Sequence, residues 1–191
     1  MGESTSSKTA ASSLGAVLTR SLREGALFVF GALSLVLFLA LASYSPLDPG
    51  FSYTGEVSRA TNLIGPAGAW LADVFFLLCG VPAFIFPIML GALGWNLYRP
   101  RVQEHASRRH VMFRLAGFAL TLATSSAIAT LHFPGSHYPQ TAGGILGDLV
   151  GVSLAASVSF LGATLLLIGV WFAGVLCMRV FIYVAILVFF S

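Results

Sequence analysis

Four long apolar runs separated by polar loops dominate the pattern along the 191-residue chain. The runs cover residues 25–43, 74–97, 115–131 and 152–178. A helix needs about 20 apolar residues to cross the roughly 30 Å hydrocarbon core of a bilayer, and each run reaches or approaches that length. No Asp, Glu, Lys, Arg or His lies inside any run. The pattern therefore predicts an all-α integral membrane protein, a bundle of four helices.

The segments outside the runs complete this organisation. Residues 1–19 are rich in Ser, Thr and Ala without an apolar period, which favours a disordered tail ahead of a membrane domain at 20–191. Loops are expected at residues 44–73, 98–114 and 132–151. The first run is longer than the roughly 7–15 apolar residues of a cleavable signal peptide, so we favour an uncleaved span.

The ten Lys and Arg residues indicate how the bundle is oriented. Three precede the first run, five lie between the second and third runs, and Arg179 follows the fourth. Only Arg59 lies in another loop. Because short cytoplasmic loops are enriched in Lys and Arg, both termini and residues 98–114 are expected inside the cell. Residues 44–73 and 132–151 are then the outer loops.

Composition excludes a soluble protein. The chain is 57% hydrophobic and 9% charged, with a mean hydropathy of +0.90. Soluble domains carry about 25% charged residues, and a water-soluble fold could not bury this much apolar surface. The net charge of +3 is small, so it matters through its distribution rather than as a sign of nucleic-acid binding.

A short polar block precedes the second run. Pro66 suits the first turn of a helix, and Trp70 suits the membrane interface. We expect a short helix at the outer surface that breaks into the second span near Asp73, whose carboxylate stays hydrated or caps a helix. A further kink is expected near Pro82 and Pro87. Residues 143–150, GGILGDLV, repeat the plan before the fourth run, which predicts a second short re-entrant or interfacial helix there.

No catalytic chemistry is visible. Phosphate-loop, zinc-protease and nucleophile-elbow motifs are absent from the sequence, and its four histidines lie in loops without metal-ligand spacing. We therefore expect no enzyme activity, cofactor or metal. The hydroxyl-rich stretch 121–130, TLATSSAIAT, favours close helix packing. The alternative is a small-solute transporter or channel subunit, with a path lined by Thr121, Ser125 and the helix broken at Pro82 and Pro87.

The C-terminal residues 178–191, MRVFIYVAILVFFS, stay apolar after one arginine. Too few apolar residues follow Arg179 to cross a bilayer again, since a crossing takes about 20. The segment either extends the fourth helix, lies in the membrane interface, or marks a divergent terminus.

Three segments also match a known pattern in order: SYSPLDPGFS (43–52), NLIGPAGAWLADVFFLLCG (62–80) and GGILG (143–147). Together they resemble the membrane domain of the FtsK family of bacterial cell-division DNA translocases, over about residues 20–177. Members of that family resemble one another in three parts: four membrane helices, a long linker and a hexameric RecA-like motor that pumps double-stranded DNA. This chain carries no Walker motif, and it looks like the amino-terminal domain alone.

The resemblance implies a membrane anchor and divisome scaffold in the bacterial inner membrane at the division septum. Its implied partners are membrane lipids, further copies in a homo-hexamer, and other division proteins, with DNA reached only through the motor. By this reading the chain serves cell division and chromosome partition without hydrolysing ATP. The residues expected to form contact or packing surfaces are Pro46, Asp48, Pro49, Gly65, Gly68, Trp70, Asp73, Gly80, Pro87, Gly143, Gly144 and Gly147.

Overall fold

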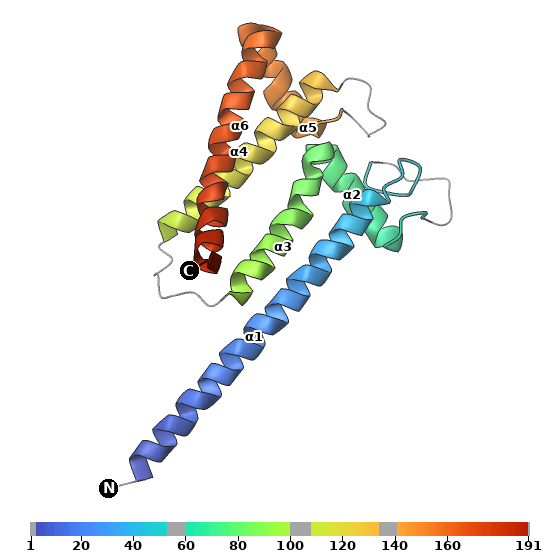
Figure 1. The fold of residues 1–191 in the computed structure, drawn as a ribbon. Coiled ribbons are helices and arrows are strands. Elements are labelled where there is room, and N and C mark those ends of the chain that lie inside the picture. The colour runs from blue at the N-terminus through green and yellow to red at the C-terminus, as the bar shows by residue number, and fades with distance from the viewer. Residues whose placement is uncertain (1–2, 53–59, 100–107, 134–140, 191) are drawn as a thin grey trace.

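Helices make up all the regular structure among the residues that the computed structural model describes, which are 3–52, 60–99, 108–133 and 141–190. The elements in chain order are α1 (Glu3–Ala42), α2 (Gly65–Cys79), the 3-10 turn η1 (Val81–Phe84), α3 (Ile85–Tyr98), α4 (Arg108–His132), α5 (Gly144–Gly147), the π-helical turn η2 (Asp148–Val152) and α6 (Ser153–Phe190). Figure 1 shows their arrangement.

Four helical stretches are long and apolar enough to cross a membrane. They are Val17–Ala42, Val81–Tyr98, Leu115–His132 and Gly144–Cys177. The predicted all-α, four-helix membrane architecture is confirmed. Large apolar side chains such as Phe28 and Leu161 are exposed on these helices, whereas Ala, Ser and Thr make up much of the buried set. That distribution suits a protein whose surroundings are hydrocarbon, because small residues let membrane helices approach closely.

The first and the last helix both extend beyond the apolar runs of the sequence. Helix α1 begins at Glu3 and so includes most of the segment 1–19, for which we expect a disordered tail. Once an apolar span has nucleated a helix, each further residue adds a hydrogen bond, so extension costs little. Helix α6 continues to Phe190, so the residues after Arg179 extend the fourth helix, which is one of the three outcomes that the sequence left open.

The helices form two pairs, α1 with α3 and α4 with α6, as Figure 1 shows. In the first pair Gly94 lies against Phe30, where an added Cβ would come within 2.7 Å of the Phe30 Cβ. The Ser34 hydroxyl donates a 2.6 Å hydrogen bond to the carbonyl of Pro87. In the second pair the Trp171 indole donates a 3.0 Å hydrogen bond to the Ser125 hydroxyl. Small residues and interhelical hydrogen bonds therefore hold each pair together.

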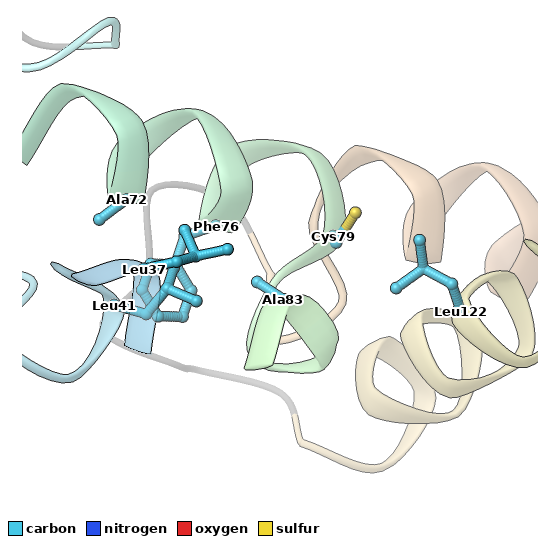
Figure 2. Packing of buried hydrophobic residues seen from close by; sticks show 7 residues of the cluster. All are labelled: Leu37, Leu41, Ala72, Phe76, Cys79, Ala83 and Leu122. Atoms are coloured by element: carbon cyan, nitrogen blue, oxygen red, sulfur yellow. The ribbon is translucent and has the colours of Figure 1, made fainter. Parts of the chain in front are cut away.

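One apolar cluster joins the two pairs, as Figure 2 shows from close by. Its members come from α1, α2, η1 and α4: Leu37, Leu41, Ala72, Phe76, Cys79, Ala83 and Leu122. Phe76 is 1% exposed, and its ring centroid lies 4.7 Å from that of Tyr44 and 5.9 Å from that of Phe84. The core thus lies where α2 passes between the ends of the two helix pairs.

The break before the second span lies at Gly80, not near Asp73 as the sequence suggested. Asp73 is in the middle of α2, and its carboxylate binds a loop instead of capping a helix. Gly80 has φ 64° and ψ −146°, a conformation open almost only to glycine, and Pro82 follows in η1. The short helix expected before the second span is therefore present, but it is α2 and it runs as far as Cys79.

The second half of the chain follows a related plan. Gly65, which opens α2, and Gly144, which opens α5, both have positive φ, at 76° and 63°. The helical path that starts at Gly144 continues through η2 into α6, where Ser159 (φ 70°, ψ 163°) interrupts it. A short helical stretch, bounded by a residue of positive φ at each end, thus precedes the long helix in both halves.

Candidate functional site

The loops after α1 fold onto the end of that helix and onto α2. We call residues 43–52 and 60–64, with the facing side of α2, the loop cap. Three buried polar side chains organise it: Asp48, Asn62 and Asp73, which are 5%, 5% and 4% exposed. The one ion pair among the described residues joins Arg20 and Glu24 on the surface of α1. Neutral hydrogen-bond donors therefore satisfy the carboxylates of the loop cap.

Asp48 ties the two parts of the loop cap together. One of its carboxylate oxygens accepts hydrogen bonds from the Thr61 backbone N–H and the Thr61 hydroxyl, each at 2.8 Å. The other accepts one from the Asn62 backbone N–H at 3.0 Å. Pro46 and Pro49, which flank this carboxylate in the chain, are exposed and half-buried. Asp48 thus fixes the point at which the chain returns toward α2.

Asn62 closes the C-terminal end of α1. Its side-chain amide donates to the carbonyls of Ala40 at 2.8 Å and Ser43 at 3.3 Å, two of the groups that a helix end leaves without intrahelical partners. Its side-chain oxygen accepts a hydrogen bond from the Ile64 backbone N–H at 3.0 Å, which is an Asx turn, in which an Asn side chain bonds the backbone two residues further on. Sequence reasoning missed Asn62 as a site residue, although an Asn just ahead of Gly65 and Pro66 was a usable signal.

Asp73 reaches from α2 to the first part of the loop cap. Its carboxylate accepts hydrogen bonds from the Ser52 backbone N–H at 2.6 Å, the Ser52 hydroxyl at 2.8 Å and the Tyr44 hydroxyl at 3.2 Å. Gly50 passes so close that a Cβ there would lie 2.7 Å from a carboxylate oxygen of Asp73. The prediction of a hydrated or helix-capping carboxylate at Asp73 was wrong, because the side chain is buried under residues 50–52.

Replacing Asp73 with alanine is expected to release residues 50–52 from α2 while leaving the helices in place. The Ser52 N–H and the Ser52 hydroxyl would lose their acceptor, which costs about 2 kcal/mol in folding free energy. Hydrogen exchange of the Ser52 amide should accelerate, and exchange within α3 should not change. Asn96→Ala is the control, because the Asn96 side-chain amide donates its hydrogen bond to the Ala92 carbonyl on its own helix. Unchanged exchange at Ser52 in the Asp73 variant would contradict this role.

A second group of predicted residues forms a tight crossing between α4 and the segment leading into α6. Added Cβ atoms at Gly143 and Gly147 would both overlap the Ser126 carbonyl, and one at Gly151 would lie 2.9 Å from the Ala127 carbonyl oxygen. These three glycines recur at intervals of four residues, the spacing that lets two helix backbones meet in a membrane. The sequence pattern singled out Gly143 and Gly147 but not Gly151 or its partner Ala127.

Gly80 and Gly144 join the two halves of the chain. The Val81 backbone N–H donates to the Ala142 carbonyl at 2.8 Å, and a Cβ at Gly80 would overlap that same carbonyl. A Cβ at Gly144 would lie 2.8 Å from the Gly80 nitrogen. The Ser126 hydroxyl donates to the Cys79 carbonyl at 3.0 Å, close to the end of α2. The break in the first half therefore packs directly on the start of the second.

Asp148 links η2 to Thr141 and to α4. Its carboxylate accepts hydrogen bonds from the Thr141 hydroxyl at 2.7 Å and the Thr130 hydroxyl at 3.2 Å. The side chain is half-buried and links η2 to the end of α4. Like Asp48 and Asp73, it joins two segments of the chain by hydrogen bonds, and sequence reasoning noted it only as part of the repeated plan.

The remaining predicted residues are scattered. Gly68 is buried, and a Cβ there would lie 2.5 Å from the Asn62 side-chain oxygen. Trp70 is 50% exposed, and its ring meets Phe51 edge-to-face at 6.2 Å. Pro87 is buried away from the loop cap, between α3 and α1. The predicted set therefore separates into a loop cap, a glycine crossing, the contact between Gly80 and Gly144, and the lone Pro87.

The residues proposed for a solute path are engaged in packing. The Thr121 hydroxyl donates to the Gly117 carbonyl at 2.8 Å, and the side chain lies against Gly174 of α6. Ser125 accepts the indole hydrogen of Trp171. This arrangement favours the packing interpretation of the hydroxyl-rich stretch. Within the described part of the chain, no three His, Cys, Asp or Glu residues gather as metal ligands would.

The chain matches known proteins over most of its length. A profile of the family described as the 4TM region of DNA translocase FtsK/SpoIIIE matches residues 19–189. A DNA translocase FtsK of Pseudomonas putida is 38% identical over 155 residues, or 80% of this chain and 19% of that protein. The DNA translocase FtsK of Shewanella oneidensis is 36% identical over 149 residues, or 77% of this chain and 16% of that protein.

This chain spans about a fifth of the length of such relatives, and the family profile that it matches describes their membrane region. No solved structure matches it at a significant level. The resemblance seen in the three sequence segments is confirmed, and the domain is a multi-pass inner-membrane domain. With residues 19–189 matching that profile and four helices able to cross a membrane, the chain belongs to the family of FtsK/SpoIIIE 4TM domains.

Proposed function

We propose that this domain is the membrane anchor and divisome scaffold of a septal DNA translocase. The observation that carries the proposal is the match of residues 19–189 to the membrane region of such translocases. In this role the domain tethers the motor at the division site, assembles with further copies of itself, as a hexamer by family resemblance, and contacts other division proteins. The positive-inside rule adds that both termini face the cytoplasm and that the loop cap faces the outside.

The loop cap offers a contact surface suited to this role. Four large apolar side chains stand exposed on it: Leu47 (67%), Phe51 (63%), Leu63 (72%) and Trp70 (50%). We call these four the apolar rim. Phe51 and Leu63 are held in place by the buried side chains of the loop cap, because Asp73 binds Ser52 next to Phe51, and Asn62 binds across the turn that contains Leu63. Rigid, exposed aromatic residues are typical anchors of protein interfaces.

Truncating the rim is therefore expected to impair recruitment without impairing insertion. We predict that Trp70→Ala, alone or with Phe51→Ala, leaves membrane insertion intact but turns the septal band of a fluorescent fusion into a uniform membrane signal. Loss of a Trp anchor buried in an interface costs about 2 kcal/mol, or roughly 30-fold in affinity for the partner. The measurement is the ratio of septal to lateral-membrane fluorescence in dividing cells.

The matched control is Phe28→Ala, which truncates an aromatic side chain that is 76% exposed on α1, away from the loop cap. It should leave the septal band unchanged. A normal septal band in the double rim variant, at an expression level equal to the wild type, would argue against the rim as the recruitment surface. Loss of the band in Phe28→Ala as well would point to a general membrane defect.

A further inference from the structure

An open pocket of about 300 Å³, called the cavity below, lies between α1 and α3, at the end of the pair away from the loop cap. Its lining residues are Leu22, Arg23, Ala26, Leu97 and Arg99. The described wall therefore combines two guanidinium groups with three apolar side chains, and none of these five residues is acidic. Nearer the loop cap, Gly94 lets α3 close onto Phe30, so the cavity opens where that tight contact ends.

Aromatic side chains indicate the level of the membrane at which this cavity lies. The Arg99 guanidinium lies 4.9 Å from the centre of the Trp95 ring, and the Trp95 and Tyr98 rings are 6.0 Å apart. Both rings are partly exposed, at 44% and 38%. Trp and Tyr at a helix end are typical of the headgroup level of a membrane, and a cation over the Trp face is held in place. The two arginines thus lie at the level of the lipid phosphates.

Two positive charges line the same cavity. Glu24 is the carboxylate nearest in sequence to Arg23, but it pairs with Arg20 at 3.0 Å on the exposed face of α1. Arg23 and Arg99 are like charges on a shared wall, an arrangement that favours an anion between them. The guanidinium group matches phosphate oxygens with two parallel hydrogen bonds, and the apolar wall suits the glycerol and upper acyl carbons of a lipid.

We propose that this cavity binds the headgroup of one anionic glycerophospholipid. Arg23 and Arg99 donate to the phosphodiester oxygens, while Leu22, Ala26 and Leu97 contact the start of the acyl chains. Basic pockets between membrane helices on the cytoplasmic side bind such headgroups in general. The proposal depends on the proposed function for one point alone, which is the leaflet that supplies the lipid. The cavity lies in the cytoplasmic leaflet if the cations face the cytoplasm. The bound lipid would then stabilise the contact between α1 and α3 close to the start of the loop at 100–107.

Native mass spectrometry of the full chain tests the site, in detergent micelles supplied with phosphatidylglycerol, phosphatidylcholine or inorganic phosphate. We expect one molecule of phosphatidylglycerol to stay tightly bound and phosphatidylcholine to bind more weakly. Each Arg→Gln change at Arg23 or Arg99 should lower the affinity for phosphatidylglycerol about fivefold, and Arg→Lys changes should lower it less. Arg20→Gln is the matched control, since it removes the same charge one turn away on α1 but outside the cavity.

Three results would overturn the proposal. The first is that the wild type retains the two lipids equally. The second is that Arg20→Gln lowers the affinity for phosphatidylglycerol as much as the changes at Arg23 and Arg99 do. The third is that inorganic phosphate displaces the lipid completely, which would assign the cavity to a soluble anion. Arg23 is exposed on its helix, so Arg23→Gln keeps the test valid if Arg99→Gln fails to fold. Micelles have no inside or outside, so a negative result in them leaves the proposed topology and function standing.

Discussion

Gly80→Ala is expected to destabilise the domain strongly, because two costs combine at this position. Its backbone (φ 64°, ψ −146°) lies in a region that residues with a Cβ avoid, which costs about 1–3 kcal/mol. The new Cβ would also overlap the Ala142 carbonyl, which is backbone and already accepts the Val81 N–H. With overpacking included, the loss in unfolding free energy should be about 3 kcal/mol or more.

The measurement is reversible unfolding in mixed micelles, followed by far-ultraviolet circular dichroism. Gly169→Ala is the matched control, because that glycine lies in α6 and its added Cβ would meet no side chain and no other helix within 4 Å. A methyl there should be neutral or slightly stabilising, since alanine is the better helix former. If Gly80→Ala unfolds like the wild type, the two halves of the chain do not meet at Gly80 and Ala142 as described.

Asp48→Ala should produce the second large effect. It removes the acceptor of two backbone N–H groups, of Thr61 and Asn62, and of the Thr61 hydroxyl. A buried donor left unsatisfied costs about 1–3 kcal/mol, so the total should be about 3 kcal/mol after water partly replaces the carboxylate. Because Asn62 also closes the end of α1, we expect the last turn of that helix to fray in the variant.

Hydrogen exchange of the Thr61 and Asn62 amides, together with micelle unfolding, tests this result. Ser45→Ala is the control within the same loop, since that hydroxyl only accepts a weak 3.4 Å hydrogen bond from the Leu47 N–H. It should change unfolding by less than about 0.5 kcal/mol. Equal exchange rates at Thr61 in the wild type and in Asp48→Ala would mean that Asp48 does not organise the loop cap.

The spans were predictable because hydrocarbon imposes a simple rule on sequence. Charged residues are costly at depth, so the apolar runs delimit the helices that cross, and proline and glycine mark where they bend. The break point was less predictable. Asp73 looked like a natural helix end by its charge, yet Gly80 has the backbone freedom that a break needs, and only its position against Ala142 reveals that use.

The candidate site was half predictable. Asp73 and the glycines stood out because polar and flexible residues beside an apolar run need a reason, and Asp48 was expected through the family resemblance of residues 43–52. Their roles depended on residues distant in the chain, such as Ser52 for Asp73 and Ser126 for Gly143, and no local pattern encodes these pairs. Asp48 and Asp73 prove to be internal supports, whereas Trp70 stands exposed on the cap.

The difference between buried supports and exposed contact residues predicts two kinds of variant, which the sequence alone could not distinguish. Changes at Asp48 or Asp73 should loosen the loop cap and reduce recruitment indirectly, by letting the rim move. Changes at Trp70 should reduce recruitment while unfolding stays close to that of the wild type. A parallel measurement of stability and septal fluorescence in Asp73→Ala and Trp70→Ala therefore distinguishes support from contact.

The proposed topology requires the loop cap and the end of the bundle that carries Arg23 and Arg99 to lie on opposite sides of the membrane. Single cysteines at Leu47, on the cap, and at Met112, near the start of α4, report this in a chain with Cys79 and Cys177 replaced by alanine; Leu47 and Met112 are 67% and 69% exposed. In intact spheroplasts, a membrane-impermeant maleimide should label the Leu47→Cys chain and leave the Met112→Cys chain unlabelled until the membrane is permeabilised. Labelling of both positions before permeabilisation, or of Met112→Cys alone, would contradict the proposed topology.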